Sequence, residues 1–126
     1  MKQLEHDLLN DKYTMVYHEA EFNFNAPHTF DVTTMVDRID GKEGKVEAAI
    51  QRVHFQEGPI KENGINGVCN EDLIAMVICR LEHFQKSEYR CRENALAITA
   101  LEEALLWLRK RTMGREKRGV EGTNIK

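Results

Sequence analysis

The apolar residues in the first half of the chain follow the short period that is typical of β-strands. Residues 13–24 and 29–39 are rich in β-branched and aromatic side chains, which favour strands. Within the first stretch, the apolar residues Met15, Tyr17, Phe22 and Phe24 partly alternate with polar ones, which is typical of a strand. We therefore predict two strands, with the break between them at Pro27.

A turn sequence leads from the second predicted strand into a third. Residues 40–44 read Asp-Gly-Lys-Glu-Gly, and residues 46–55 return as a strand. This spacing pairs 29–39 with 45–55 in a hairpin whose loop is longer than the tight two-residue type. The sequence thus predicts a small antiparallel β-sheet over about residues 12–56.

A glycine-rich border follows the sheet. Gly58, Gly64 and Gly67 allow sharp turns and the close approach of another chain or ligand. The segment lacks the spacing of a P-loop or of a dinucleotide-binding turn. It is therefore a strong turn signal and a weak phosphate signal.

The second half of the chain changes to a helical period. Asn70 is the predicted N-cap of a first helix, in which Leu73, Val77, Leu81 and Phe84 form an apolar stripe. A helix thus follows the glycine-rich border.

A second helix is expected to start near Ser87 after a short connection. Its own stripe has the steps of four and three that are typical of an antiparallel helix seam, at Cys91, Ala95, Ile98, Leu101, Leu105 and Leu108. The predicted fold class is α+β, with the sheet followed by an antiparallel pair of long helices over about residues 70–118. At 126 residues, we expect residues 1–126 to form a single domain.

The helices carry more apolar residues than one seam can cover. Leu96, Leu106 and Trp107 lie on other faces of the second helix. We therefore expect an oligomer in which helices pack between subunits. One thick monomeric core is the alternative interpretation.

Composition indicates a soluble globular protein, with 41% hydrophobic and 31% charged residues. No apolar run is long enough to cross a bilayer, and acidic residues near the start argue against a signal peptide. The three cysteines form no CxxC pair, so we expect reduced thiols that serve as small core residues. These features predict a reducing, cytoplasmic setting.

The positive charge is concentrated in residues 107–122, although the formal net charge of the chain is -3. Arg111, Arg115 and Arg118 lie at i, i+4 and i+7, so they share one face of a continuing helix. Guanidinium groups in this arrangement suit phosphate oxygens. The alternative is a solvated helix end with cations near the negative pole of the helix dipole.

The sequence offers little chemistry for catalysis. The five histidines show no HxH or HExxH spacing, and the one serine, Ser87, lacks a GxSxG setting. We therefore predict a protein that is not an enzyme, with no catalytic residues, no metal site and no cofactor.

Two residues at the expected helix connection suit a nucleotide base. Phe84 offers an aromatic face, and Asn94 offers an amide that can bond an adenine edge. The spacing of Phe84 from Leu81 favours a core stripe residue, and Asn94 can be a satisfied polar group on the helix surface. In one hairpin both lie at the bend, whereas Arg111 and Arg115 lie at the far end. A base and its phosphates can share one pocket only if another subunit supplies one of these sets.

Three strings in the second half resemble a known family: FQEGPIKENGINGVCNEDLIAMVICRLEHFQ, CRENALAITALEEALLWLRKRT and REKRGVEG. They are similar to the phage anti-Thoeris sponge family (Thoeris anti-defence protein one). That family shares its helical hairpin with the phage anti-CBASS sponge. The resemblance runs from about residue 55 to residue 123, and the N-terminal strands match only in general layout.

The resemblance implies a non-enzymatic sponge that sequesters a glycocyclic ADP-ribose messenger without cleaving it, in the cytoplasm of the infected bacterial host. It also implies a homo-oligomer, expected to be a hexamer, and separate sites for cyclic di- or trinucleotides. DNA, RNA and membranes are not expected partners.

The resemblance also implies roles for individual residues. Phe84 would stack on the adenine, Asn94 would bond the ligand, and Arg111 and Arg115 would neutralise the diphosphate. Arg118 and Gly119 open the loop that would meet a cyclic oligonucleotide at a symmetry axis.

Two other function classes compete with sequestration. A hydrolase or phosphodiesterase acting on the same messengers needs a catalytic residue that the sequence does not reveal. A nucleic-acid-binding module would use the basic helix end, but the chain is acidic overall and has no recognised DNA- or RNA-binding motif.

Overall fold

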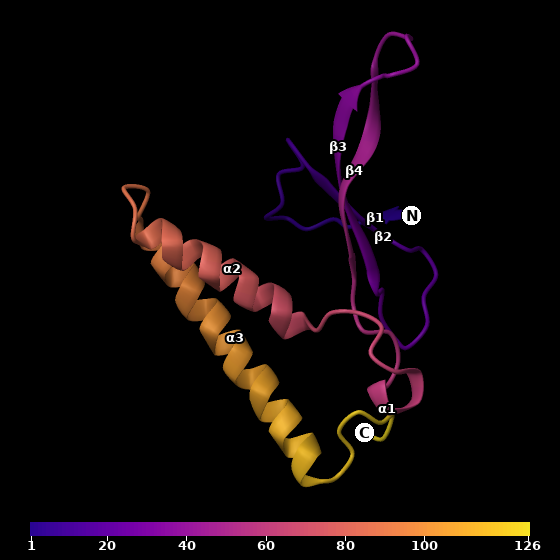
Figure 1. Ribbon diagram of the computed structural model, residues 1–126. Helices are drawn as coiled ribbons and strands as arrows, with labels where there is room; N and C mark the ends of the chain where they lie inside the picture. Colours follow the sequence, from indigo (N-terminus) through magenta and orange to yellow (C-terminus); the bar gives the residue numbers. More distant parts are fainter. The chain divides into compact units, whose positions relative to one another are not determined.

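The computed structural model describes residues 1–126 and shows an antiparallel sheet followed by helices (Figure 1). The predicted α+β class is therefore confirmed. The chain divides into two compact units, Met1–Gly58 with Ile65–Gly67 and Pro59–Gly64 with Val68–Lys126. The predicted sheet part falls in the first unit and the predicted helical part in the second. That they fold as a single domain stays a prediction.

The first unit contains a four-stranded antiparallel sheet whose strands follow sequence order. Its strands are β1 (Lys2–Gln3), β2 (Met15–His18), β3 (Thr29–Asp37) and β4 (Lys45–His54). The predicted hairpin of the two long strands is confirmed, with Asp37 opposite Lys45 and Thr29 opposite His54. The register shifts after Val32, where Ile50 is an extra residue in β4.

The predicted strand over residues 13–24 is too long, because β2 ends at His18. The Glu19 carboxylate accepts hydrogen bonds from the backbone N–H groups of His28 at 2.9 Å and Thr29 at 3.0 Å. These bonds close a loop in which Phe24 and Asn25 adopt positive φ angles of 53° and 72°. Side-chain bonding to the backbone thus replaces a strand ladder here.

Strand β1 was not predicted, because Lys2–Gln3 is too short to show any alternation. It pairs with β2, where Lys2 lies opposite His18 and Gln3 opposite Tyr17. A two-residue strand is defined only by its partner.

A charged pair joins the two long strands. Asp31 and Arg52 are directly opposite each other, and Arg52 Nε and Nη2 donate to the two Asp31 carboxylate oxygens at 2.7 and 2.9 Å. Asp31 is buried, whereas the Arg52 side chain is exposed. The hydrogen bonds from Arg52 hold the pKa of Asp31 below its ordinary value.

Gly67 makes the close backbone approach that its residue type allows. A Cβ atom at this position would lie 2.4 Å from the backbone carbon of Phe55 and 2.6 Å from the backbone oxygen of His54. Only glycine can hold the border segment against the end of β4.

The second unit contains three helices, α1 (Ile60–Asn63), α2 (Asn70–Gln85) and α3 (Arg92–Lys117). The short α1 was not predicted. The predicted N-cap of α2 is wrong by one residue, since Cys69 is the cap and its N–H donates to Asp72 Oδ2 at 2.8 Å. The start of α3 is also later than predicted, at Arg92, after the N-cap residue Cys91, whose Sγ accepts from the N–H of Asn94 at 3.4 Å.

Ser87 lies in the connection between α2 and α3 and does not begin α3. Its hydroxyl donates to the carbonyl of Phe84 at 2.6 Å and accepts from the N–H of Tyr89 at 3.1 Å. Gln85 closes the same connection, because its amide bonds both the N–H and the carbonyl of Cys91, at 3.0 and 2.9 Å. The bend is therefore fixed by two polar side chains.

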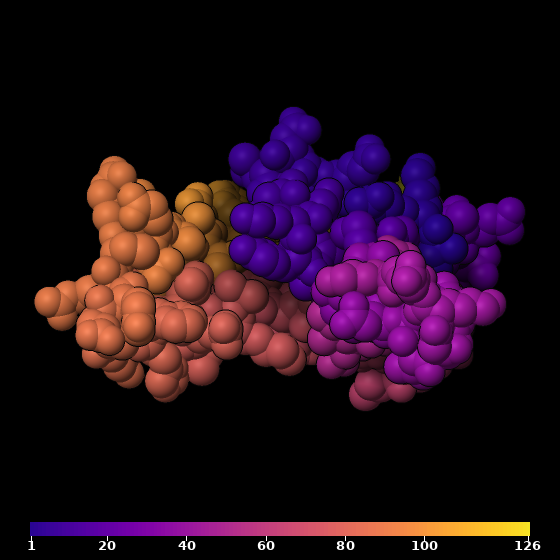
Figure 2. Space-filling view, turned by 90° about the horizontal axis from the view of Figure 1, so that it is seen from above, coloured from indigo at the N-terminus to yellow at the C-terminus, as the bar shows by residue number.

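Helices α2 and α3 pack against each other as a hairpin, and the space-filling view shows them in contact near the bend (Figures 1 and 2). The predicted α3 stripe is confirmed at four of its six residues, which are half-buried: Ile98, Leu101, Leu105 and Leu108. Its first two members, Cys91 and Ala95, are exposed.

The predicted stripe of α2 is correct at two of its four residues and wrong at the other two. Its members Leu73 and Leu81 are covered together with Ile74 and Ile78, whereas Val77 and Phe84 are exposed. The helix has apolar residues on two faces, so their spacing alone does not reveal which face packs on α3. Ile78 is the one buried apolar residue of the chain, so the hairpin covers only a narrow seam.

The expectation that the cysteines are core residues is also wrong. Cys69, Cys79 and Cys91 are free and exposed. Two of them occupy helix N-cap positions, which lie at the surface. None of the helices combines the length and the apolar character that a membrane span requires.

Candidate functional site

A basic pocket lies on the C-terminal part of α3. It is a cavity of about 420 Å³ lined by Trp107, Lys110, Arg111, Gly114, Arg115 and Arg118. The structure thus brings together the three arginines whose spacing predicts one face. Because this volume falls in the range of small-molecule pockets, the cluster is a candidate anion site.

The three arginines of the basic pocket differ in how far they are already engaged. Arg115 Nη2 donates to the carbonyls of Val120 at 3.1 Å and Thr123 at 3.0 Å. Arg118 Nη1 donates to the carbonyl of Lys126 at 2.7 Å. Arg111 is exposed and has no hydrogen bond or ion pair from its side chain within the chain. Arg111 therefore offers its whole guanidinium group to a ligand.

The neighbouring cations are held in other ways. Arg109 forms an ion pair with Glu116 at 3.3 Å and does not line the basic pocket. Lys110 Nζ lies 5.3 Å from the centroid of the Trp107 ring, in cation–π range. The Trp107 side chain is 60% exposed, so the pocket also has an apolar wall.

Gly119 has a structural role at the end of α3. Its φ angle is +73°, and it follows the C-cap residue Arg118. The Gly119 N–H bonds the carbonyl of Glu116, and the Val120 N–H bonds that of Arg115, both at 3.0 Å. These two bonds form a Schellman motif, in which glycine is favoured at the left-handed position. The backbone conformation of Gly119 is thus explained without any ligand.

An aromatic pocket lies at the other end of the hairpin. It is a cavity of about 430 Å³ lined by Arg80, His83, Phe84, Ser87 and Tyr89. Phe84 is 38% exposed, so the structure contradicts its interpretation as a core residue and leaves its ring accessible. The Arg80 guanidinium carbon lies 5.3 Å from the Phe84 centroid.

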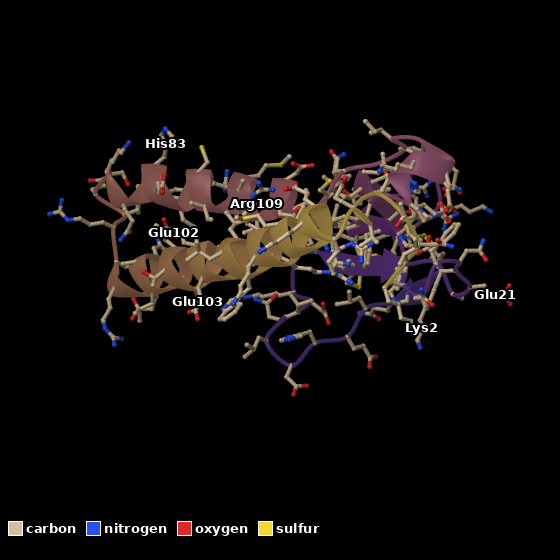
Figure 3. All side chains as sticks on the ribbon, turned by 90° about the horizontal axis from the view of Figure 1, so that it is seen from below. Lys2, Glu21, His83, Glu102, Glu103 and Arg109 are labelled. Carbon is tan, nitrogen blue, oxygen red and sulfur yellow. The ribbon has the colours of Figure 1, made fainter.

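His83 contributes one edge of the aromatic pocket. Its Nδ1 lies 2.8 Å from the carbonyl oxygen of Cys79, which fixes the ring on the helix. The side chain points away from α3 on the outer side of α2 (Figure 3).

Asn94 lies near the aromatic pocket but not in its lining. It is half-buried in the first turn of α3, and its backbone N–H is the one that Cys91 caps. The structure does not bring its amide into the cavity with Phe84. Its predicted contact with the ligand stays a prediction.

The two pockets share no lining residue and lie at opposite ends of the hairpin. Asn94 and Arg111 belong to one continuous helix, so at 1.5 Å per residue they are about 25 Å apart along its axis. One hairpin therefore presents the aromatic pocket and the basic pocket as two separate candidate half-sites.

Several lining residues were missed by the sequence analysis. Arg80 lies one helical turn before Phe84, and Trp107 one turn before Arg111, so the i, i+4 spacing could have revealed both. Tyr89 belongs to the connection, where no period applies, and only the folded bend brings it to the pocket.

Comparison with known proteins connects this hairpin to a family. Residues 47–113 match the model of the Acb2/Tad1 hairpin domain. The protein "Thoeris anti-defense 1" of Bacillus phage SBSphiJ7 is 51% identical over an alignment of 142 positions that covers 100% of both chains. The chain belongs to the Thoeris anti-defense 1 family.

The family model and the phage protein match different lengths of this chain. The hairpin-domain model includes Phe84, Asn94 and Arg111 but ends before Arg115 and Arg118. The similarity to the phage protein spans the sheet as well as the hairpin. The three sequence strings lie outside most of the sheet, whose strands resemble the family only in general layout. The full-length similarity shows that the sheet is shared with this relative as well.

Proposed function

We propose that this protein is a phage anti-defence sponge that counters Thoeris immunity by binding glycocyclic ADP-ribose and holding it intact. Family membership supports the anti-Thoeris role. The observation that carries the sponge mechanism is the pair of half-sites, one offering an exposed aromatic ring and the other a cluster of guanidinium groups. An adenine ring and a diphosphate need these two chemistries.

In this proposal Phe84 stacks on the adenine and Asn94 bonds the ligand. Arg111 and Arg115 neutralise the diphosphate through charge-assisted hydrogen bonds. Stacking contributes about 1–3 kcal/mol and each charge-assisted bond about 1.5–3 kcal/mol. A nanomolar sponge needs about 12 kcal/mol, so several of these contacts must converge on one ligand.

The separation of the half-sites requires a second subunit, which makes assembly part of the function. One hairpin cannot close both half-sites on a ligand that is much shorter than 25 Å, the approximate spacing along α3. We propose that the aromatic pocket of one subunit meets the basic pocket of another in a homo-oligomer, expected to be a hexamer. A pocket on a rigid helical frame also lowers the entropic cost of binding.

The amount of exposed surface supports an assembly. The chain exposes 9951 Å². A compact protein of its mass would expose about 6,900 Å², and two separate proteins of half that mass about 8,300 Å² together. Large apolar residues account for part of the excess, among them Met76, Leu96, Leu106, Trp107 and Met113.

We also propose that the protein acts in the cytoplasm of the infected host and is not an enzyme. The residues of the two half-sites are suited to stacking, hydrogen bonding and charge neutralisation. Cyclic di- or trinucleotide binding at Arg118 and Gly119 stays a prediction of the family resemblance. The conformation of Gly119 adds no support, because the helix end explains it.

The test is recovery of the ligand after capture. The protein is incubated with glycocyclic ADP-ribose, separated from free ligand, and heated to denature it. Sequestration predicts that intact messenger is released at no more than one molecule per site. A cleaved product in excess of the sites would establish the hydrolase alternative. Native mass spectrometry of the same sample gives subunit number and ligand count together.

A further inference from the structure

Arg115 differs from Arg111 in that its guanidinium is already held on one side. Arg115 is half-buried, and its Nη2 donates to two backbone carbonyls, those of Val120 and Thr123. Its Nε and Nη1 make no such bond, and the side chain lines the basic pocket. Nη2 is therefore engaged, whereas Nε and Nη1 keep donors that can reach an oxyanion.

The segment that holds Arg115 is itself organised by Thr123. The Thr123 hydroxyl and its backbone N–H both donate to the carbonyl of Val120, the backbone bond at 3.1 Å. Arg115, the Thr123 hydroxyl and the Thr123 N–H thus converge on one carbonyl oxygen. The hydroxyl closes a tight turn that directs both carbonyls toward the arginine.

Helix α1 anchors the same segment from outside. The Lys61 N–H donates to the carbonyl of Gly122 at 2.9 Å. Gly122 has a φ angle of +75°, and a Cβ atom there would lie 3.2 Å from Lys61 Cγ. The contact is tight, and all of its residues belong to the second unit.

We infer that Thr123 is a positioning residue, which acts through Arg115 by holding the 120–123 segment against its guanidinium. The inference rests on the proposed function, in which Arg115 binds a ligand diphosphate. A long side chain that is free in solution loses rotamer freedom when it binds. An arginine already fixed by two carbonyls avoids part of that loss. Thr123 therefore raises affinity without touching the ligand.

The experiment compares Thr123→Val, which removes the hydroxyl but keeps the shape, with Thr123→Ser, which keeps the hydroxyl. Affinity for glycocyclic ADP-ribose is measured by calorimetry, and native mass spectrometry checks the assembly. Thr123→Val is expected to bind about three- to tenfold more weakly, the range that corresponds to one freed side chain. Thr123→Ser is expected to bind within about twofold of the wild type, because it restores the bond to Val120.

A double-mutant cycle separates positioning from general damage to the segment. In the Arg115→Ala background, Thr123→Val should cause no further loss, because the residue through which it acts is gone. An equal loss in both backgrounds would overturn the inference. So would wild-type affinity in Thr123→Val when Arg115→Ala binds weakly. If the wild-type chain takes up no glycocyclic ADP-ribose at all, the proposed function fails with it.

A second variant covers the case in which Thr123→Val does not fold. Gly122→Ala places a Cβ against Lys61 and should weaken binding in the same way. Gly41→Ala is the matched control, since its φ angle of +79° is similar but nothing lies within 4 Å of the added atom. Equal affinities of these two glycine variants would contradict the role assigned to the segment.

Discussion

Arg111 is the residue on which the proposed phosphate contact depends most directly. Arg115 and Arg118 each give hydrogen bonds to backbone carbonyls of the C-terminal segment, so removing either one changes the fold locally as well as the charge. Arg111 has no such bond, and only its contribution to a ligand is lost on substitution. Spacing places the three guanidinium groups on one face, but it does not show which of them are already engaged.

We predict that Arg111→Ala weakens binding of glycocyclic ADP-ribose by about 1.5–3 kcal/mol, the value of a charge-assisted hydrogen bond. Calorimetry measures the affinity, and the oligomer should persist. Arg109→Ala is the matched control, because Arg109 lies on the same helix but outside the basic pocket. If both variants lose the same affinity, the effect is one of net charge and Arg111 has no specific contact.

The Asp31–Arg52 pair makes the stability of the sheet depend on pH. The pKa of Asp31 in the folded chain lies below its ordinary value of 3.8, so the stabilisation is complete above that value. It is lost as the pH falls through the lower, folded pKa. We predict that the unfolding temperature of Arg52→Ala approaches that of the wild type between about pH 4 and pH 2. A constant difference across this range, measured by circular dichroism, would contradict the assignment.

The elements of the fold were predictable where their period or turn chemistry was unambiguous. The hairpin of β3 and β4 follows from two long β-rich stretches on either side of a glycine turn. The loop after β2 was not predictable, because it depends on a carboxylate that bonds N–H groups nine and ten residues away. The seam of α2 was predicted correctly at Leu73 and Leu81 but not at Val77 and Phe84, since apolar residues occupy more than one of its faces.

The same limit applies to the candidate site. The chemistry of the Phe84 and Arg111 half-sites follows from residue types and helical spacing. The engagement of Arg115 by the 120–123 segment depends on a tertiary contact that no spacing encodes. The position of Asn94 outside the aromatic pocket depends on how the bend closes.

The Gln85 side chain closes the connection between α2 and α3, and its removal should loosen the bend. Gln85→Ala deletes two hydrogen bonds to Cys91, for which we expect a loss of about 1–3 kcal/mol in the free energy of unfolding. Urea denaturation measures this loss. Gln51→Ala is the control, because the Gln51 amide bonds only the carbonyl of its neighbour Arg52. Equal free energies of unfolding of the two variants would show that the Gln85 hydrogen bonds contribute nothing to stability.

The whole chain leaves a large apolar surface uncovered on its helices, and the proposed oligomer would cover it. The Leu106 side chain is 71% exposed on α3, and the neighbouring Trp107 side chain is 60% exposed. A charge placed there must be desolvated if the face is buried between subunits.

We predict that Leu106→Glu dissociates the assembly into smaller species, as measured by size-exclusion chromatography with light scattering. Leu8→Glu is the matched control, since Leu8 is 89% exposed and lies in the first unit. Dissociation by the control alone would assign the subunit contact to the N-terminal part of the chain.

The distance between the two half-sites has a consequence for the time course of infection. In the proposed mechanism neither half-site closes on a ligand alone. A dilute chain would then neutralise almost no messenger, and capture capacity would rise more steeply than the amount of protein made. Protection of the phage then begins at a threshold of synthesis, set by the affinity of the subunits for one another. A host that detects infection early gains time before that threshold is reached.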